Sequence, residues 1–232
     1  MQYCWTTSWG LSTRFIGAII MVHGDDKGLI MPPRLAPHQV VIVPIFRTDD
    51  EKAKVMEAVN RIRAELAAAE VRVKVDERDE SPGFKYNDWE MRGVPLRLEV
   101  GPKDVEKGTA ALARRDTLRA GKEGKSFVPQ AGIAQTVVET LKSIQQSLYD
   151  RALAFRTANT FAPATYNDFK AAVEKGFAFS YWCGEAECET QIKEETKATT
   201  RCIPLDGQPA EPGLCIHCGQ PATEKAVFAK AY

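Results

Sequence analysis

Residues 181–188 read YWCGEAEC, and residues 214–219 read LCIHCG. The two segments contain two cysteine pairs in the pattern C-x4-C-x26-C-x2-C, formed by Cys183, Cys188, Cys215 and Cys218. Two closely spaced pairs on separate turns are typical of a tetrahedral zinc site, and four thiolates leave no open position for catalysis. Gly184 and Gly219 follow the first and last cysteine, as expected where the backbone turns tightly around the sulfurs. The spacing therefore predicts a structural Zn²⁺ that stabilises a small domain.

Disulfide bonds are the alternative for these cysteines, but they would require a secreted chain. The first residues lack the basic start and apolar run of a signal peptide, so we expect reduced thiols and a cytoplasmic protein. Cys202 lies between the pairs in a segment that favours a strand, and we interpret it as a buried thiol that binds no metal. His217 lies between the last two cysteines, and the spacing leaves open its use as a substitute ligand.

The composition indicates a globular chain without a global charge signal. Its 232 residues are 44% hydrophobic, and 31 basic residues balance 31 acidic ones. Nucleic-acid binding would therefore have to depend on a local patch. The apolar stretches are too short to span a bilayer, so we expect no membrane partner.

The middle of the chain alternates between strand and helix patterns. Thr48 and Glu51 form a capping-box pattern before an apolar repeat of helical period. We predict strands at 39–46, 71–75, 94–100 and 109–115, and helices at 49–69, 82–92 and 133–157. These elements predict one compact α/β domain over about residues 38–150.

The two flanking segments are smaller. After residue 150 we predict helices at 166–175 and 185–196 and strands at 177–182, 199–204 and 226–230, which is a unit with a meagre core. At the N-terminal end we predict a strand at 2–9 and a helix that starts near Ser12 and ends at Gly24. One strand and one apolar helix cannot form a core alone, so we expect them to pack on another domain.

Three groups of residues could carry function. The segment 10–14, GLSTR, places Arg14 in the first turn of an apolar helix, where backbone N–H groups and a guanidinium suit a phosphate. The local pattern alone favours a solvated arginine. The segment 84–90, FKYNDWE, mixes aromatic and charged side chains and could either pack or bind. The three histidines form no Ser/His/Asp or Cys/His arrangement.

The third group is basic. Arg97 and Glu99 share one face of a predicted strand, with Lys103, Lys107, Arg114, Arg115 and Lys125 in neighbouring segments. Arginine and glutamate can pair with base edges, and Phe127 could stack on a base, as in readers of single-stranded RNA. A salt-bridged face exposed to solvent is the alternative, and the pattern alone favours it.

Several longer stretches resemble one family. They are TSWGLSTRFIGA at 7–18, HGDDKGL at 23–29, PPRLAP at 32–37, GVPLRLEVGPKD at 93–104, TTRCIP at 199–204 and VFAKAY at 227–232. Together they are similar to class II prolyl-tRNA synthetases of the archaeal and eukaryotic-like type, which carry a C-terminal zinc-binding domain. The likeness covers essentially the whole chain and begins at motif 3.

The resemblance implies three parts. Residues 1–35 would be a remnant of the class II catalytic domain, and residues 36–150 an anticodon-binding domain with a mixed sheet and flanking helices. Residues 151–232 would be a small α+β zinc-binding domain. The implied anticodon-binding residues are Arg97, Glu99, Lys103, Arg114, Arg115 and Lys125, and the implied zinc ligands are Cys183, Cys188, Cys215 and Cys218.

The resemblance also implies a catalytic role for the N-terminal part. Arg14 would hold the γ-phosphate of ATP, with Ser12 and Thr13 in the ATP-binding segment, and the carboxylate of Tyr232 would reach toward the active site. The parent enzyme would be a homodimeric proline–tRNA ligase that uses ATP, Mg²⁺, proline and tRNA(Pro). Motifs 1 and 2 are expected upstream and are absent, so we expect the isolated chain to be unable to activate proline. The alternatives are a non-catalytic tRNA-binding accessory module and a zinc-stabilised interaction domain with no RNA role.

Overall fold

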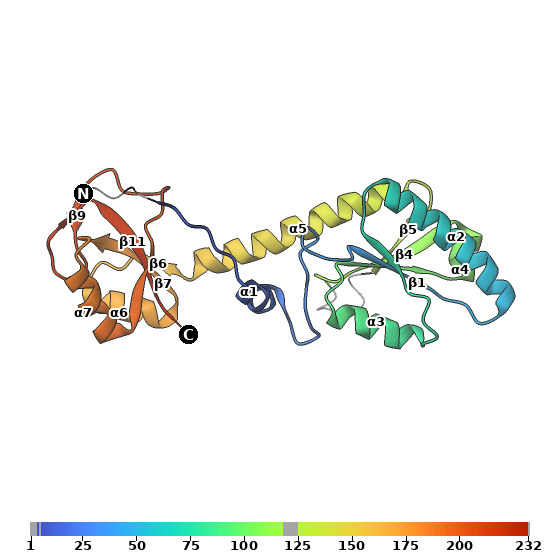
Figure 1. The fold of residues 1–232 in the computed structure, drawn as a ribbon, viewed down its shortest axis with the longest axis horizontal. Helices are drawn as coiled ribbons and strands as arrows, with labels where there is room; N and C mark the ends of the chain where they lie inside the picture. Colours follow the sequence, from blue (N-terminus) through green and yellow to red (C-terminus); the bar gives the residue numbers. More distant parts are fainter. Residues whose placement is uncertain (1–3, 5, 118–124, 232) are drawn as a thin grey trace. The chain divides into compact units, whose positions relative to one another are not determined.

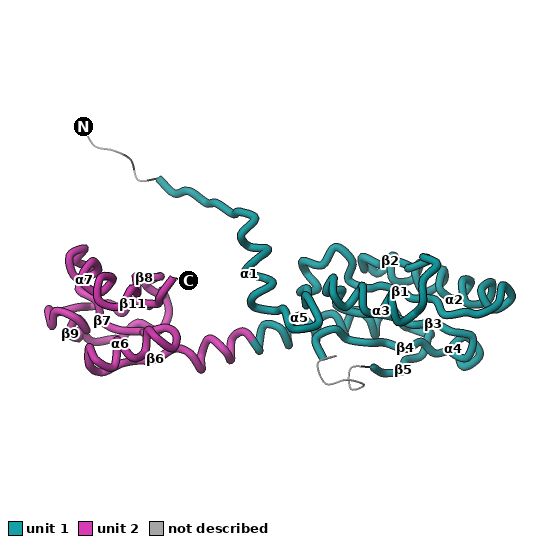
Figure 2. Tube along the Cα trace, turned by 90° about the horizontal axis from the view of Figure 1, so that it is seen from below, with its two compact units in different colours: residues 1–151 teal, residues 152–232 magenta. Residues whose placement is uncertain are grey.

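The computed structural model describes residues 4, 6–117 and 125–231. They form two compact units, Met1–Arg151 and Ala152–Tyr232, with the division inside a long helix, α5 (Figure 2). None of the helices in the described part of the chain combines the length and the apolar character needed to cross a bilayer. The first 35 residues are grouped with the α/β elements that follow them.

The first unit contains a five-stranded mixed sheet in the order β2-β1-β3-β4-β5. The strands are β1 (Val40–Pro44), β2 (Val73–Val75), β3 (Leu96–Val100), β4 (Thr109–Arg114) and β5 (Lys125–Pro129). β1, β2 and β3 are parallel, whereas β4 pairs antiparallel with β3 and β5 pairs antiparallel with β4. All five residues of β1 are buried, as an apolar strand at the centre of a covered parallel sheet requires. The mixed α/β sheet that we expected is therefore confirmed.

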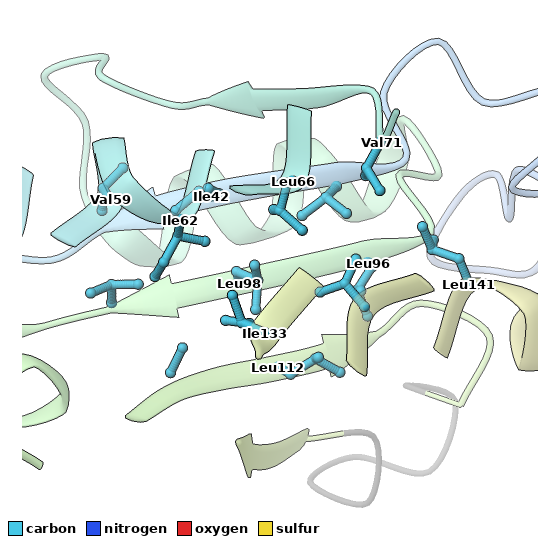
Figure 3. Packing of buried hydrophobic residues seen from close by; sticks show 14 of the residues in the cluster. Ile42, Val59, Ile62, Leu66, Val71, Leu96, Leu98, Leu112, Ile133 and Leu141 are labelled. Atoms are coloured by element: carbon cyan, nitrogen blue, oxygen red, sulfur yellow. The ribbon is translucent and has the colours of Figure 1, made fainter. Parts of the chain in front are cut away.

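In the described part of the chain, helices accompany both faces of this sheet (Figure 1). They are α2 (Asp49–Ala68), α3 (Pro82–Met91), α4 (Pro102–Lys107) and α5 (Ile133–Ala158). The apolar stripes of α2 and α5 join one face of the sheet in the main core, where Ile62, Leu98 and Ile133 meet (Figure 3). The other face carries a smaller cluster in which Trp89 of α3 packs on Val41 and Val43. The sheet is therefore covered on both faces at β1.

Thr48 begins α2 as predicted. Its hydroxyl accepts a hydrogen bond from the Glu51 amide at 3.3 Å. The Glu51 carboxylate accepts instead from the amide of Arg47 at 2.8 Å, one residue before the cap. The capping pattern thus marks the helix start correctly, although its second bond is shifted.

The N-terminal prediction is only partly correct. The strand expected at residues 2–9 is wrong for the described positions 4 and 6–9, which have no regular structure and are exposed. The helix is confirmed as α1 (Arg14–His23), with Gly24 at its C-terminal cap. All ten residues of α1 are exposed or half-buried, and Phe15, Ile16 and Met21 expose most of their apolar surface.

The segment after α1 packs on the α/β unit. Ile30 has no exposed surface and belongs to the main core. The amide of Leu29 donates to the Met91 carbonyl at 3.1 Å, and the amide of Met31 donates to the Gly93 carbonyl at 3.0 Å. Gly93 has φ +76°, and an added Cβ would lie 2.5 Å from the Leu29 carbonyl oxygen. This close approach requires glycine.

The second unit contains a four-stranded sheet in the order β6-β7-β11-β8. The elements are β6 (Thr160–Phe161), α6 (Tyr166–Lys175), β7 (Phe177–Trp182), α7 (Ala186–Thr196), β8 (Ala198–Cys202), β9 (Gly213–Leu214), β10 (Pro221–Ala222) and β11 (Glu224–Lys230). Phe169 of α6 and Phe228 of β11 meet edge to face at 5.2 Å in a small core that also includes two cysteines. A core this small gains much from a metal.

The prediction that Cys202 is buried is wrong, and a β-bulge explains why. Along β8, Thr200 pairs with Phe228, but Cys202 pairs with Val227 because the register shifts by one residue. Regular pairing would have placed Cys202 opposite Ala226, which lies in the core. The shift moves the thiol to the opposite face of the sheet, where it is exposed.

Candidate metal centre and nucleic-acid interface

The four paired cysteines come from three elements of the second unit. Cys183 follows β7, Cys188 lies in the first turn of α7, and Cys215 and Cys218 lie between β9 and β10. All four Sγ atoms lie within 4.8 Å of one another. The Cys188–Cys215 and Cys183–Cys218 separations are 3.6 and 3.7 Å. A regular tetrahedron with Zn–S bonds of about 2.3 Å has sulfurs about 3.8 Å apart, so this donor set fits Zn²⁺.

The backbone supports this geometry. Gly184 and Gly219 have φ of +84° and +70°, so Cys183 and Cys218 are each followed by a glycine in the left-handed conformation. Burial raises the pKa of the Cys188 thiol. Burial also opposes ionisation of Cys215, but the amides of Cys218 and His217 point at its sulfur and lower its pKa. The turn therefore favours the thiolate form that a metal needs.

His217 lies beside the four sulfurs. Its Nδ1 is 3.4 Å from the Sγ of Cys188, and its ring meets Tyr166 edge-on at 4.9 Å between centroids. Its Nε2 lies 3.7 Å from a carboxylate oxygen of Glu195. His217 is therefore a neighbour of the cluster, and the four thiols supply a complete set of four ligands without it.

Arg97 and Glu99 do share one face of β3, as predicted. The Nε of Arg97 donates to Glu99 Oε1 at 3.2 Å, and its Nη1 donates to Glu90 Oε1 of α3 at 2.6 Å. The guanidinium lies 4.0 Å from the ring centroid of Tyr86, also on α3. Arg97 is 8% exposed and Glu99 is 3% exposed, so neither an open reading pair nor a solvated salt bridge describes them.

The open part of this face lies over β4 and β5. Lys125 Nζ donates to Glu99 Oε2 at 2.5 Å while 39% of its side chain stays exposed. The register places Glu99, Ala111 and Phe127 in one row across three strands. Phe127 is 69% exposed. An aromatic ring and a cation thus stand at the surface above a buried carboxylate.

The adjacent residues Arg114 and Arg115 point to opposite faces of the sheet. Arg114 forms an ion pair with Asp116 at 2.9 Å and donates to Ser143 of α5 at 3.1 Å. Arg115 is 1% exposed, and its guanidinium binds both carboxylate oxygens of Asp25, at 2.6 and 3.0 Å. It also donates to the carbonyls of Gly28 and Glu90. The structure therefore does not bring Arg115 to the surface.

The other predicted site residues lie on the surface or beyond the described part. Lys103 and Lys107 are exposed on α4. Ser12, Thr13 and Arg14 are exposed at the start of α1, where Ser12 Oγ accepts from the Arg14 amide at 3.4 Å. Tyr232 lies outside the described residues. The exposed lysines of α4 and β5 therefore belong to the α/β domain, whereas the GLSTR segment lies before it, at the start of α1.

Sequence reasoning missed the contribution of α3. Asp76, at the end of β2, accepts from Trp89 Nε1 at 2.7 Å and binds Arg78 through both oxygens. Burial alone would raise the pKa of Asp76, but the hydrogen bonds from Arg78 and Trp89 lower it to about 2. The mixed aromatic and charged composition of residues 84–90 was the available sequence signal for a helix that both packs and binds polar groups. Tyr86 and Glu90 contact Arg97, while Trp89 packs on Val41 and Val43.

Two family models match this chain. Residues 39–131 match the model described as "Anticodon binding domain", and residues 166–232 match "Prolyl-tRNA synthetase, C-terminal". The first range includes Arg97, Glu99, Lys125 and Phe127, and the second includes all four clustered cysteines. The two matches therefore coincide with the two candidate sites.

Curated proteins named proline–tRNA ligase match the chain over its whole length. The relative from Roseiflexus castenholzii is 57% identical, and that from Chloroflexus aggregans is 54% identical; the chain covers 48% of each. The relative from Cytophaga hutchinsonii is 49% identical, with 47% covered. In each case 100% of this chain is aligned. The chain thus spans about half the length of the curated relatives it matches.

Proposed function

Since the chain belongs to the prolyl-tRNA synthetase family and matches its C-terminal part, we propose that it is the tRNA-binding portion of a proline–tRNA ligase. The observation that carries the proposal is the face of β3, β4 and β5, which lies within the anticodon-binding match. An exposed cation and an exposed aromatic ring there flank a buried carboxylate. Stacking and hydrogen bonding to unpaired bases require these groups.

The reading groups divide by their exposure. Lys125 and Phe127 would contact the anticodon loop directly, with Lys103 on its phosphates, whereas Arg114 lies on the opposite face of the sheet, toward α5. Glu99 would accept hydrogen bonds from base N–H groups once Lys125 moves aside. Arg97 would hold Glu99 from beneath. Arg115 would support this face as a buried anchor.

We propose that Cys183, Cys188, Cys215 and Cys218 hold a structural Zn²⁺. The sulfur separations and the left-handed glycines after Cys183 and Cys218 support this assignment. The purified chain should contain one zinc per molecule, and a strong chelator should unfold residues 160–231 while the α/β unit keeps its protected amides. Cys202→Ser is the matched control, since this exposed thiol is outside the cluster and its loss should leave the zinc content unchanged. A second unit that keeps its fold after the metal is removed would contradict the assignment.

Activation of proline would take place in the complete homodimeric enzyme in the cytoplasm. Its substrates would be ATP and proline, and Mg²⁺ would be the metal ion. Arg14, with Ser12 and Thr13, would hold the triphosphate, because a guanidinium can stabilise charge on the leaving pyrophosphate. The carboxylate of Tyr232 would approach that site. The apolar surface of α1, which includes Phe15 and Ile16, is consistent with a larger catalytic body covering it.

A titration with RNA tests the proposal. The 232-residue chain is mixed with proline tRNA and with the same tRNA altered at its anticodon, at one fixed salt concentration. We expect the native anticodon to be preferred by at least about fivefold, since a correct base contact contributes about 1–3 kcal/mol. Equal binding of both tRNAs would overturn the proposed reading face. Whether the natural reading frame continues upstream of Met1 with motifs 1 and 2 separates the ligase from an accessory module, because the isolated chain is expected to bind tRNA without activating proline in both cases.

A further inference from the structure

Two residues of α3 restrict Arg97 to one orientation. Glu90 Oε1 accepts from Nη1 at 2.6 Å, and the Tyr86 ring covers one face of the guanidinium at 4.0 Å. Burial, followed by the charge of Glu99 and a hydrogen bond to its carboxylate, raises the pKa of the Tyr86 phenol, so the ring stays neutral beside these carboxylates. Arg97 is therefore fixed on its edge by a carboxylate and on its face by an aromatic ring.

The orientation of Arg97 determines that of Glu99. The two residues are neighbours on one face of β3, and Arg97 Nε binds Oε1 of the carboxylate at 3.2 Å. The other oxygen, Oε2, binds Lys125, the partly exposed lysine of β5. One oxygen is thus held from inside the protein, while the other is turned toward the open part of the face. The four side chains Glu90, Arg97, Glu99 and Lys125 balance in charge, so the buried pair carries no excess charge.

We propose that Tyr86 and Glu90 are positioning residues for anticodon discrimination, which they achieve by fixing Arg97 and, through it, the carboxylate of Glu99. This inference rests on the proposed reading of the anticodon by this face. Neither residue needs to touch the RNA. Without them, Arg97 can swing away and Glu99 can rotate, so that Oε2 no longer meets base N–H groups in one fixed place. Binding to phosphates by the exposed lysines would continue.

The test compares three substitutions on α3. Tyr86→Leu removes the ring from Arg97, Tyr86→Phe keeps it, and Phe84→Leu removes an exposed ring that lies against Arg78 instead. For each variant, dissociation constants are measured with proline tRNA and with the anticodon-altered tRNA. The ratio of the constant for the altered tRNA to that for the native tRNA measures discrimination. We expect Tyr86→Leu to lower the ratio of the two constants by roughly fivefold to tenfold, which is part of the discrimination that one base contact provides. Phe84→Leu should keep the ratio within about twofold of the native value, because the Arg97 packing remains. Tyr86→Phe also keeps the ring on Arg97 but removes the hydrogen bond of the hydroxyl to Glu99, so we expect its loss to be smaller than that of Tyr86→Leu.

Glu90→Gln provides a second probe that leaves the ring in place. It removes the charged acceptor of Arg97 Nη1, and we expect it to lower the same ratio. The salt dependence of binding should stay unchanged for Tyr86→Leu and Glu90→Gln, because neither residue contacts a phosphate. A variant that was merely less stable would lose affinity for both tRNAs equally, and thermal unfolding of each sample measures that loss directly.

Glu99→Gln separates this inference from the function beneath it. If Glu99→Gln lowers the ratio but Tyr86→Leu and Glu90→Gln leave it unchanged, the positioning role is wrong and the reading face stands. If Glu99→Gln also leaves the ratio unchanged, this face does not read the anticodon, and both proposals fail. Equal losses from Tyr86→Phe and Tyr86→Leu would show that the ring–guanidinium contact is not the cause, and would also overturn the inference.

Discussion

Replacing Arg115 by methionine should destabilise the first unit strongly, although the sequence pattern makes this residue look like a surface RNA contact. The guanidinium is 1% exposed and makes four hydrogen bonds, two of them to the Asp25 carboxylate. The other two satisfy the carbonyls of Gly28 and Glu90. Methionine fills a similar volume but leaves all of these acceptors without the cation.

The size of the effect follows from burial. Removing one partner of a buried ion pair typically costs about 3–5 kcal/mol, because the remaining charge is stranded away from water. The Asp25 side chain keeps 11% of its surface exposed, so we expect the lower end, about 3 kcal/mol. This is a large part of the roughly 5–15 kcal/mol that stabilises a typical domain.

Urea unfolding followed by hydrogen exchange at the amides of β1 and β3 measures the stability of this unit alone. Arg92→Met is the matched control, because Arg92 pairs with Asp88 at 2.9 Å but its side chain is 59% exposed. Its loss should cost less than about 1 kcal/mol. The double variant Arg115→Met/Asp25→Asn should be more stable than the sum of the single changes predicts. If Arg115→Met lies within about 1 kcal/mol of the native protein, the argument from burial is refuted.

Two further outcomes are expected. The pKa of Asp76 is lowered to about 2 in the folded state, so its ionised form stabilises the fold at pH values above the unfolded pKa near 4. About 2 kcal/mol of this stability is lost as the pH falls from about 4 to about 2. Measuring the free energy of unfolding against pH should show this loss in the native protein and not in Asp76→Asn. Gly93→Ala should destabilise the first unit by about 2 kcal/mol or more, because alanine disfavours φ +76° and its Cβ would approach the Leu29 carbonyl oxygen to 2.5 Å; an unchanged melting temperature would contradict this.

Local chemistry made the regular elements predictable. The apolar period of α2 and α5, the cap at Thr48 and the apolar run of β1 each depend on neighbours in sequence. The strand β5 was missed because its residues are exposed or half-buried and end at a proline, which gives no alternation. The helix α4 was missed because its six residues are too few for a helical period.

Pairing across the sheet was beyond local patterns. The prediction for Cys202 assumed regular alternation along β8, and a single bulge opposite Val227 and Phe228 reversed the face of the thiol. The cysteine cluster was different, since metal-ligand spacing is itself a sequence signal that depends on short turns. The assembly of four sulfurs within 4.8 Å follows from those turns; the identity of the metal stays a prediction.

Burial of charge could not be predicted for the same reason. The spacing of Arg97 and Glu99 fixes that they share a face, but their burial depends on Tyr86 and Glu90, which a helix brings over β3. Arg114 and Arg115 look equivalent in sequence, yet alternation sends them to opposite faces of the sheet, toward α5 and toward the turn at Asp25. A basic residue in a strand is therefore a candidate for RNA contact only after its partners on the covering layer are known.

These partners also indicate where the α/β domain begins. The resemblance to a known family suggests a boundary near residue 35, with everything before it left from a catalytic domain. However, Ile30 is in the main core, Leu29 and Met31 form backbone hydrogen bonds with residues 91 and 93, and Asp25 is bound by the buried Arg115. We therefore infer that the folding unit starts at about Gly24, directly after α1. A variant that begins at residue 36 would lose the core residue Ile30 and the carboxylate partner of Arg115. A variant that begins at residue 24 would lose only the segment before α1 and α1 itself, which the unit does not bury.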